Sequence, residues 1–233
     1  MRVIYFGYDA FSRCLEAVLN NPNYEIVKIF SFESDGFFDF NDKTRALALG
    51  HNIEFTTEKI TAQELSRQVN ENGCELVFCA GYAYRIPIES VNVTAVNIHP
   101  SPLPRGRGPW PMPWAILRGE KTWGVTAHKL APKIDEGDIL FADTFLLEDS
   151  ENYKSLGEKI ALSAEYVTKT VLENLKPLWQ NAKKQESGEY LPEPSDSERT
   201  IYLDTPKQKR ELLIRAFGED YVIYSENNEN GGK

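Results

Sequence analysis

The sequence has few cysteines, no long apolar run and a deficit of positive charge. Its three cysteines, Cys14, Cys74 and Cys79, are odd in number and show no C-x-x-C spacing, which predicts buried, reduced thiols rather than a disulfide framework or a zinc site. No stretch approaches the roughly 18 apolar residues of a membrane span, and Met1 leads directly into a strand pattern without a signal peptide. We therefore expect a cytoplasmic protein.

The charge balance excludes some partners. Lys and Arg together number 26 against 35 Asp and Glu, so the 233-residue chain carries a formal charge of −9. A net negative charge opposes non-specific attraction to nucleic acid phosphates and to anionic membranes, so neither partner is expected. The hydrophobic content of 41% and charged content of 26% are typical of a soluble protein with one well-buried domain and a small appendage.

Several signatures of cofactor and nucleophile chemistry are absent. The first loop, Gly7-Tyr8-Asp9-Ala10, has a single glycine and lacks both the G-x-G-x-x-G fingerprint and a glycine-rich phosphate cradle, so NAD and ATP are not expected there. The turn at Asp135–Asp138 lacks the oxygen ligands of an EF-hand, and no metal is expected. Ser101 lies between prolines without a nucleophile-elbow pattern.

What is present predicts an α/β fold. Short apolar runs indicate buried parallel strands, and apolar residues at helical spacing indicate the helices between them. Two alternating segments joined by the turn at Asp135–Asp138 predict an antiparallel pair. The predicted fold is Rossmann-like, with a mostly parallel twisted sheet and flanking helices. Strands are expected at 2–6, 25–32, 53–55, 75–80, 93–98, 122–130 and 139–147, and helices at 10–19, 44–49, 61–70, 110–117 and 152–178.

The composition changes after Pro177, which divides the chain. We expect a main catalytic domain over 1–180 and a small C-terminal subdomain over 181–225. This subdomain should contain a helix at 206–217 and a strand at 221–224. A Gly/Asn-rich tail over 226–233 is expected to be disordered.

Three polar residues form a candidate site. Asn97 and His99 end one predicted strand and Asp135 follows another, and ligands of parallel sheets gather at the carboxyl ends of strands. A histidine beside a carboxylate can act as a general base, and an amide can donate to a carbonyl oxygen that gains charge. These groups suit acyl transfer by direct attack of an amine. The alternative is structural: such a histidine commonly serves the fold, as we interpret His51 and His128, and Asp-x-Gly-Asp is commonly a turn.

The motifs around these residues resemble the folate-dependent formyltransferases, most closely the sugar N-formyltransferases. The resemblance lies in Asn97-x-His99, the loop Ser101-Pro102-Leu103-Pro104 with Arg105 and Gly108, and the strand Gly124-Val125-Thr126 with Asp135-x-Gly137 beyond it. It runs from Met1 to about Leu178, with a weaker echo at 214–217. The family's loop commonly has leucine at the position of Pro102.

The resemblance implies the donor and the roles of the residues. N10-formyltetrahydrofolate would supply the formyl group, Asn97 would orient and polarise it, His99 would stabilise the oxyanion or accept the amine proton, and Asp135 would hold His99 and relay the proton. The implied donor-binding residues are Tyr82, Tyr84, Arg85, Ile86, Pro87, Ile88 and Asp138. The implied acceptor-binding residues are Tyr8, Ser101, Arg105, Gly106, Arg107, Gly108 and Trp110.

The expected acceptor is the amine of a dTDP- or UDP-linked amino-deoxy sugar, in an enzyme of lipopolysaccharide biosynthesis that forms a homodimer. Methionyl-tRNA formyltransferases carry a further C-terminal domain and basic surfaces, whereas this acidic chain ends at Lys233. Glycinamide ribonucleotide transformylases have a glycine/serine-rich first loop. The alternatives are a glycinamide ribonucleotide-like amine, methionyl-tRNA, hydrolysis of the donor, and a non-catalytic module that binds folate or nucleotide.

Overall fold

The computed structural model describes residues 1–34 and 40–226. Of the tail expected over 226–233, all but Glu226 lies outside the described residues. The middle of the stretch over 33–42, which its acidic composition predicts to be an exposed loop, lies outside them as well.

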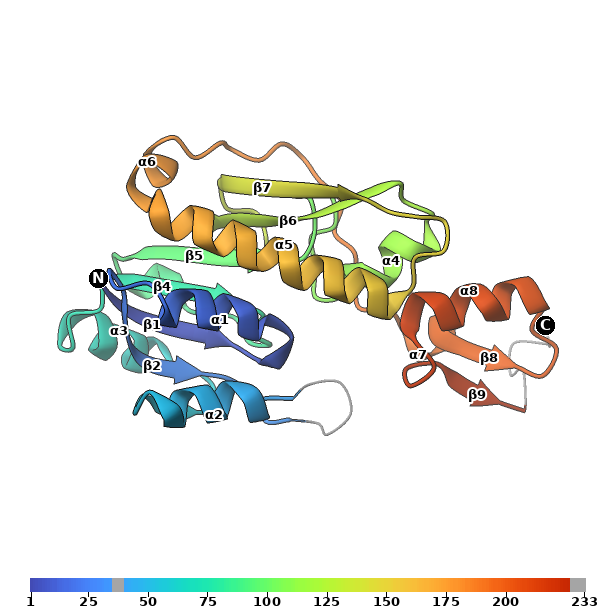
Figure 1. The fold of residues 1–233 in the computed structure, drawn as a ribbon, viewed down its shortest axis with the longest axis horizontal. Helices are drawn as coiled ribbons and strands as arrows, with labels where there is room; N and C mark the ends of the chain where they lie inside the picture. Colours follow the sequence, from blue (N-terminus) through green and yellow to red (C-terminus); the bar gives the residue numbers. More distant parts are fainter. Residues whose placement is uncertain (35–39, 227–233) are drawn as a thin grey trace.

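A seven-stranded sheet forms the centre of the molecule (Figure 1). Its strand order is β3-β2-β1-β4-β5-β6-β7; the pairs from β3 to β5 are parallel, and β6 and β7 pair in antiparallel fashion at one side. This confirms the predicted Rossmann-like α/β fold. The strands are β1 (Arg2–Gly7), β2 (Glu25–Phe30), β3 (Glu54–Thr56), β4 (Leu76–Ala80), β5 (Thr94–His99), β6 (Thr122–Lys129) and β7 (Ile139–Leu146).

Helices cover both faces of the sheet. Among the described residues, no helix combines the length and apolar character that crossing a membrane requires. As its sequence predicts, α3 begins at a Thr61 cap, whose hydroxyl oxygen accepts a hydrogen bond from the Glu64 amide at 3.1 Å. The helices of this region are α1 (Ser12–Leu19), α2 (Asp42–Gly50), α3 (Ala62–Asn70), α4 (Pro111–Leu117), α5 (Tyr153–Glu173) and α6 (Leu175–Gln180), with 3₁₀ turns η1 (Asp9–Phe11) and η2 (Ile88–Ser90).

The two faces of the sheet carry separate apolar clusters, because successive side chains of a strand point to opposite faces. On β1, Val3 and Tyr5 belong to the cluster that α1 and α5 cover, whereas Ile4 and Phe6 belong to the cluster that includes Leu65 of α3. Figure 1 shows α1 and α5 side by side on one face, where they contact each other. Each fully buried side chain of this size stabilises the fold by about 1.5–3 kcal/mol.

The single helix predicted over 152–178 is wrong, because the chain breaks at Asn174. There φ is −125° and ψ is 25°, so α5 ends at Glu173 and α6 begins at Leu175. Pro177 explains the break: it has no N–H to bond the carbonyl of Glu173, and in the first turn of a new helix that loss costs little.

The C-terminal residues form a small unit that packs beside the sheet domain (Figure 1). It comprises α7 (Asp196–Arg199), β8 (Thr200–Tyr202), α8 (Lys207–Phe217) and β9 (Ile223–Ser225), with β8 and β9 parallel. The expected helix and final strand are present, and α7 and β8 are further elements that the sequence pattern does not predict. α8 contacts α4 and buries Leu213, Ala216 and Phe217. Division into domains at 180 stays a prediction.

The centre of the sheet should be the most sensitive part of the fold. Phe78 on β4 is fully buried and stacks on Tyr5 with ring centroids 6.1 Å apart. We expect Phe78→Ala to lower the free energy of unfolding by about 3–5 kcal/mol, because it loses buried apolar surface and leaves a cavity. Leu162→Ala, at a side chain that is 58% exposed, should change it by less than about 0.5 kcal/mol. Urea denaturation followed by circular dichroism measures both, and equal losses would contradict this account.

Candidate active site

Strand β5 delivers Asn97 and His99 to one face of the sheet at its carboxyl end. The two residues are two positions apart, so their side chains point the same way. The antiparallel register places Asn97 opposite His128 and His99 opposite Thr126 of β6. His99 is buried and Asn97 is half-buried. The amide of Asn97 therefore stays reachable, while the imidazole lies in a dry environment.

The loop that follows β5 folds back over His99. The buried hydroxyl of Thr126 donates to the carbonyl of Ser101 at 2.8 Å and accepts from the amide of Leu103 at 3.1 Å. This brings the carbonyl of Gly106 to 2.8 Å from Nε2 of His99. Gly106 has φ of 81°, and a Cβ there would lie 2.8 Å from the side chain of Ser101. Only glycine fits, which explains the Arg-Gly-Arg-Gly sequence.

The turn after β6 brings Asp135 to the same place. Its Oδ1 lies 3.4 Å from Nδ1 of His99, and its Oδ2 accepts a hydrogen bond from the Gly108 amide at 2.9 Å. The carboxylate is buried, and the residue has φ of 55°, a left-handed conformation that costs energy for aspartate. The structure thus brings Asn97, His99 and Asp135 together, as the sequence predicts.

His128 is the member of this cluster that the sequence did not reveal. Its Nδ1–H donates to the carbonyl of Lys129 at 2.8 Å, so its Nε2 accepts from the Asn97 amide at 3.0 Å. The same Nε2 lies 3.6 Å from Oδ1 of Asp135. The interpretation of His128 as a structural residue stays a prediction, and the structure places it in contact with Asn97 and near Asp135. The alternating sequence of β6 predicts that His128 lies on a strand, but only the register of β6 with β5 shows that His128 lies opposite Asn97.

Burial and the neighbouring charges give His99 and Asp135 different protonation states at neutral pH. Burial lowers the pKa of His99 below its ordinary value, against the opposing effect of Asp135. Burial by itself would raise the pKa of Asp135, but its interactions with His99 and His128 and the hydrogen bond from the Gly108 amide together lower it to about 2. At neutral pH the site therefore pairs a neutral imidazole with an ionised carboxylate.

The hydrogen bond of His99 defines which of its nitrogens can accept a proton. Because Nε2–H donates to the Gly106 carbonyl, the lone pair lies on Nδ1. That nitrogen faces Oδ1 of Asp135 at 3.4 Å. A proton taken up at Nδ1 would thus be stabilised at once by the carboxylate, which is the arrangement a general base needs.

The residues predicted to bind the donor line two neighbouring loops. Arg85 joins them, since its Nε donates to the carbonyl of Pro132 at 3.3 Å and its Nη2 pairs with Glu89 at 2.7 Å. Pro87 is half-buried, and Asp138 pairs with Lys129 at 3.2 Å. The rings of Tyr82 and Tyr84 meet edge to face, and Ile86 and Ile88 are buried in the apolar cluster beneath.

The residues predicted to bind the acceptor divide into two groups. Ser101, Gly106 and Gly108 lie beside the triad, whereas Trp110 packs edge to face against Phe217 of the C-terminal unit. Both arginines of the loop bond other residues of the protein, although Arg105 is exposed and Arg107 is buried. Arg105 bonds Glu120 at 2.8 Å and the Thr122 carbonyl at 2.9 Å, and Arg107 bonds Gln185 at 2.8 Å.

The first loop places a carboxylate where a phosphate could otherwise bind. Tyr8 packs against Phe32, and Asp9 accepts hydrogen bonds from the amides of Lys43 and Thr44 at 3.0 and 2.8 Å. These amides belong to the first turn of α2, where helices favour anions. Because Asp9 already supplies that negative charge, the helix end does not attract a phosphate group.

The cysteine thiols and the hydroxyl of Ser101 are unsuited to nucleophilic attack. Burial raises the pKa of the Cys14 and Cys79 thiols to about 12, and all three cysteines are free and buried, as predicted. The hydroxyl of Ser101 is buried and donates to the carbonyl of Arg105 at 2.9 Å. In residues 1–34 and 40–226, no group of three His, Cys, Asp or Glu side chains is arranged to hold a metal ion.

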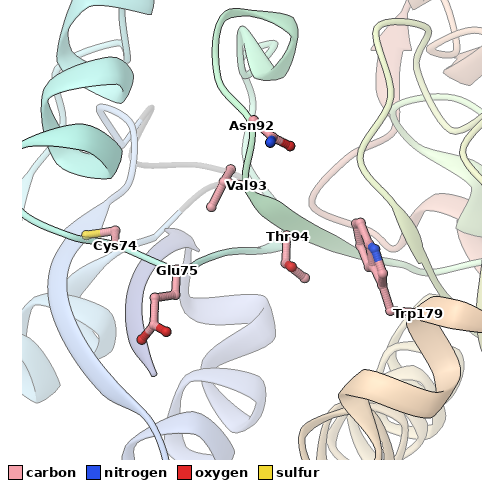
Figure 2. A pocket seen from close by; sticks show the side chains of 6 residues that line it. All are labelled: Cys74, Glu75, Asn92, Val93, Thr94 and Trp179. Atoms are coloured by element: carbon pink, nitrogen blue, oxygen red, sulfur yellow. The ribbon is translucent and has the colours of Figure 1, made fainter.

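A pocket of about 410 Å³ lies at the opposite end of the sheet (Figure 2). It is lined by the start of β4 and β5, with Trp179 as one wall, whereas the triad lies at the carboxyl ends. Burial raises the pKa of the Cys74 thiol on its lining, so that group stays protonated. The thiol of Cys74 is therefore not an activated nucleophile in this pocket. Its lining residues are Cys74, Glu75, Asn92, Val93, Thr94 and Trp179.

The fold and the site define a Rossmann-like α/β protein whose polar cluster suits acyl transfer to an amine. The Formyl transferase family pattern matches residues 11–172, and the chain belongs to this family. It is 29% identical over 199 residues to a methionyl-tRNA formyltransferase of Ehrlichia ruminantium and 31% identical over 195 residues to that of a Wolbachia species. These alignments cover 82% and 78% of this chain, which spans 66% and 64% of the two relatives.

Solved structures share the fold. A sugar N-formyltransferase from a Shewanella species superposes with a TM-score of 0.75 and 21% identity, over 97% of this chain and 93% of that one. HypX from Aquifex aeolicus in complex with tetrahydrofolic acid superposes with a TM-score of 0.67 and 20% identity, over 94% of this chain and 34% of that one.

The electrostatic coupling of His99 and Asp135 can be measured directly. We expect the His99 imidazole to titrate below 6.5, its ordinary pKa, because burial disfavours the imidazolium. Asp135→Asn should lower this pKa further, since the carboxylate charge that raises it is lost. Proton–nitrogen NMR of the ring nitrogens measures both values. Glu136→Gln, at the exposed neighbouring position, is the matched control and should leave the His99 titration unchanged. A higher pKa in Asp135→Asn would contradict this coupling.

Proposed function

We propose that this protein transfers a formyl group from N10-formyltetrahydrofolate to the amine of a dTDP- or UDP-linked amino-deoxy sugar. The observation that carries the proposal is the juxtaposition of a neutral His99 Nδ1, an ionised Asp135 carboxylate and the half-buried amide of Asn97 at one sheet edge. Each group has a task in formyl transfer to an amine, and family membership supports the donor.

The residues present fit such a donor. One N–H of the Asn97 amide bonds His128, and the second is available for a carbonyl oxygen. Around the site, Tyr82 to Ile88 and Pro132 to Asp138 form adjacent loops that Arg85 ties together. These loops would hold the pterin, with Tyr82 and Tyr84 as ring walls. When bound, N10-formyltetrahydrofolate would supply a formyl carbon attached to a nitrogen leaving group.

The side chains then divide the work of one acyl transfer. The acceptor nitrogen forms a bond to the formyl carbon while Asn97 donates to the formyl oxygen, which gains negative charge. His99 accepts the proton that the amine loses, at Nδ1, and Asp135 stabilises the resulting imidazolium. As the bond from the formyl carbon to the folate nitrogen breaks, the same proton returns to that nitrogen. Protons balance without water, metal or a covalent enzyme adduct.

The choice of a sugar acceptor is supported by charge and by the first loop. The formal charge of −9 disfavours a polynucleotide, and the Asp9 carboxylate fills the end of α2 that a phosphate could otherwise use. The solved relatives with this fold include the Shewanella sugar N-formyltransferase and WlaRD, a sugar 3N-formyl transferase. WlaRD superposes with a TM-score of 0.72 over 98% of this chain at 19% identity.

Methionyl-tRNA is the second candidate acceptor. The curated relatives with 29–31% identity are named methionyl-tRNA formyltransferases. The donor and the roles of Asn97, His99 and Asp135 would be the same. Only the surface that holds the acceptor would differ, and the same assay can therefore test both acceptors.

The role of His99 predicts a large loss of turnover on substitution. His99→Asn should lower kcat by about 10²–10⁴-fold, because it removes the proton acceptor while its size stays similar. Asn97→Ala should lower kcat by about 10²–10³-fold. His51→Asn, at an exposed histidine after α2, is the matched control and should retain wild-type turnover. Formation of tetrahydrofolate in the presence of an active acceptor measures all three. Near wild-type turnover of His99→Asn would rule out the proposed proton transfer.

The acceptor can be identified by product mass. The protein with N10-formyltetrahydrofolate should add one formyl group to at least one member of a panel of dTDP- and UDP-linked amino sugars. Formylation of charged initiator methionyl-tRNA instead would establish the second candidate. Release of formate without any acceptor would identify a hydrolase, and binding of folate without turnover would identify a binding module.

A further inference from the structure

The segment Lys183–Pro192, called the strap here, connects α6 to the C-terminal unit. In Figure 1 it is the long trace that runs from α6 past β7 toward α7. Its first residue exchanges two backbone hydrogen bonds with Ile139, at 2.7 and 2.8 Å. Near its other end, the Leu191 amide donates to the carbonyl of Arg107 at 2.6 Å. The strap is thus attached to the start of β7, which follows the Asp135 turn, and to the loop that contains Arg107.

Between these attachments, the side-chain amide of Gln185 forms four hydrogen bonds. Its Nε2 donates to the carbonyls of Asp135 and Gly137, at 2.8 and 2.6 Å. Its Oε1 accepts from Nε and Nη2 of Arg107, at 3.2 and 2.8 Å. An amide side chain has two N–H donors and two acceptor lone pairs, so Gln185 uses its full capacity here.

Gln185 bonds the backbone of Asp135 and Gly137 and the guanidinium of Arg107, whose conformation or burial is energetically costly. Asp135 has a left-handed φ of 55°, which persists only where the surroundings determine it. Gly137 leaves no room for a Cβ, which would lie 1.8 Å from the carbonyl of Lys129. Arg107 is buried, and its nearest carboxylate oxygen, on Glu136, lies 3.9 Å away. Its neighbour Gly108 donates to Oδ2 of Asp135.

We propose that Gln185 is a positioning residue for the reaction: its amide holds the backbone of Asp135 and joins that turn to the Arg107 loop, so that the carboxylate stays against His99. This inference rests on the proposed function. The hydrogen bonds form a closed circuit, from Gln185 to Asp135, from the Asp135 carboxylate to Gly108, and from Arg107 back to Gln185. Loss of Gln185 opens this circuit at both loops.

A simpler role would be to attach the strap alone. In that case loss of Gln185 lowers stability but leaves the geometry of Asp135 and His99 unchanged. A positioning role requires that the same substitution alters the His99 titration and turnover. These readouts separate the two roles, because attachment of the strap by itself moves neither of them.

The test compares Gln185→Met with the full-length wild-type protein. Methionine keeps the length of the side chain and loses all four hydrogen bonds. We expect kcat to fall by about 10–100-fold, since small displacements of a catalytic group have effects of this size. KM should change less. The His99 pKa, measured by NMR, should fall, because the carboxylate that raises it moves away. Glu189→Gln, which removes the strap's ion pair with Arg118, is the matched control and should change neither quantity.

A second variant tests the proposal if Gln185→Met does not fold. Gln185→Asn keeps a neutral amide but is one methylene shorter, so it cannot bond the Asp135 turn and Arg107 at once; it should fold and still lose turnover. Wild-type kcat and an unchanged His99 titration in either folded variant would overturn the proposal, even if stability falls. The NMR titration of His99 does not require that the protein be active. If the wild-type protein transfers no formyl group, the proposed function fails, while the shift of the His99 titration still tests the position of Asp135.

Discussion

The ionised carboxylate of Asp135 is the interaction on which the rest of the site depends. A buried carboxylate is costly unless it is paired or hydrogen-bonded; here the Gly108 amide donates to it, and protonation of His99 gives it a charged partner. The carboxylate in turn favours protonation of His99 at Nδ1, which burial would otherwise prevent. The pKa values of the two groups are therefore coupled, and removal of either leaves the other without its partner.

The sheet provides the geometry that makes this coupling possible. The first five strands are parallel and end at a common edge, where β5 presents Asn97 and His99. The change to antiparallel pairing at β6 sets His128 opposite Asn97, and the turn between β6 and β7 returns Asp135 to the same edge. Because β6 runs antiparallel to β5, it ends opposite Val96, near the start of β5, and the segment after it folds back to place Asp135 beside His99. The site thus depends on the path of this segment as well as on the strand register.

Segments outside the sheet pack against the loops that carry the site. The strap attaches to the loops of Asp135 and Arg107 through Gln185, and α8 packs against α4 next to Trp110. Polar side chains that could attract an acceptor, such as Arg105 and Arg107, are held by internal partners.

The sequence by itself determined the fold class, most element positions and the place of Asn97 and His99 at a strand end, because apolar periodicity and strand ends are local properties, whereas the return of Asp135 to them depends on the tertiary structure. It also predicted the three free, buried cysteines. Only the tertiary structure decided the place of His128, the break at Asn174, the pair of β8 and β9, and the contacts of Gln185. Strand register and contacts between residues some 50 positions apart depend on how the chain closes on itself.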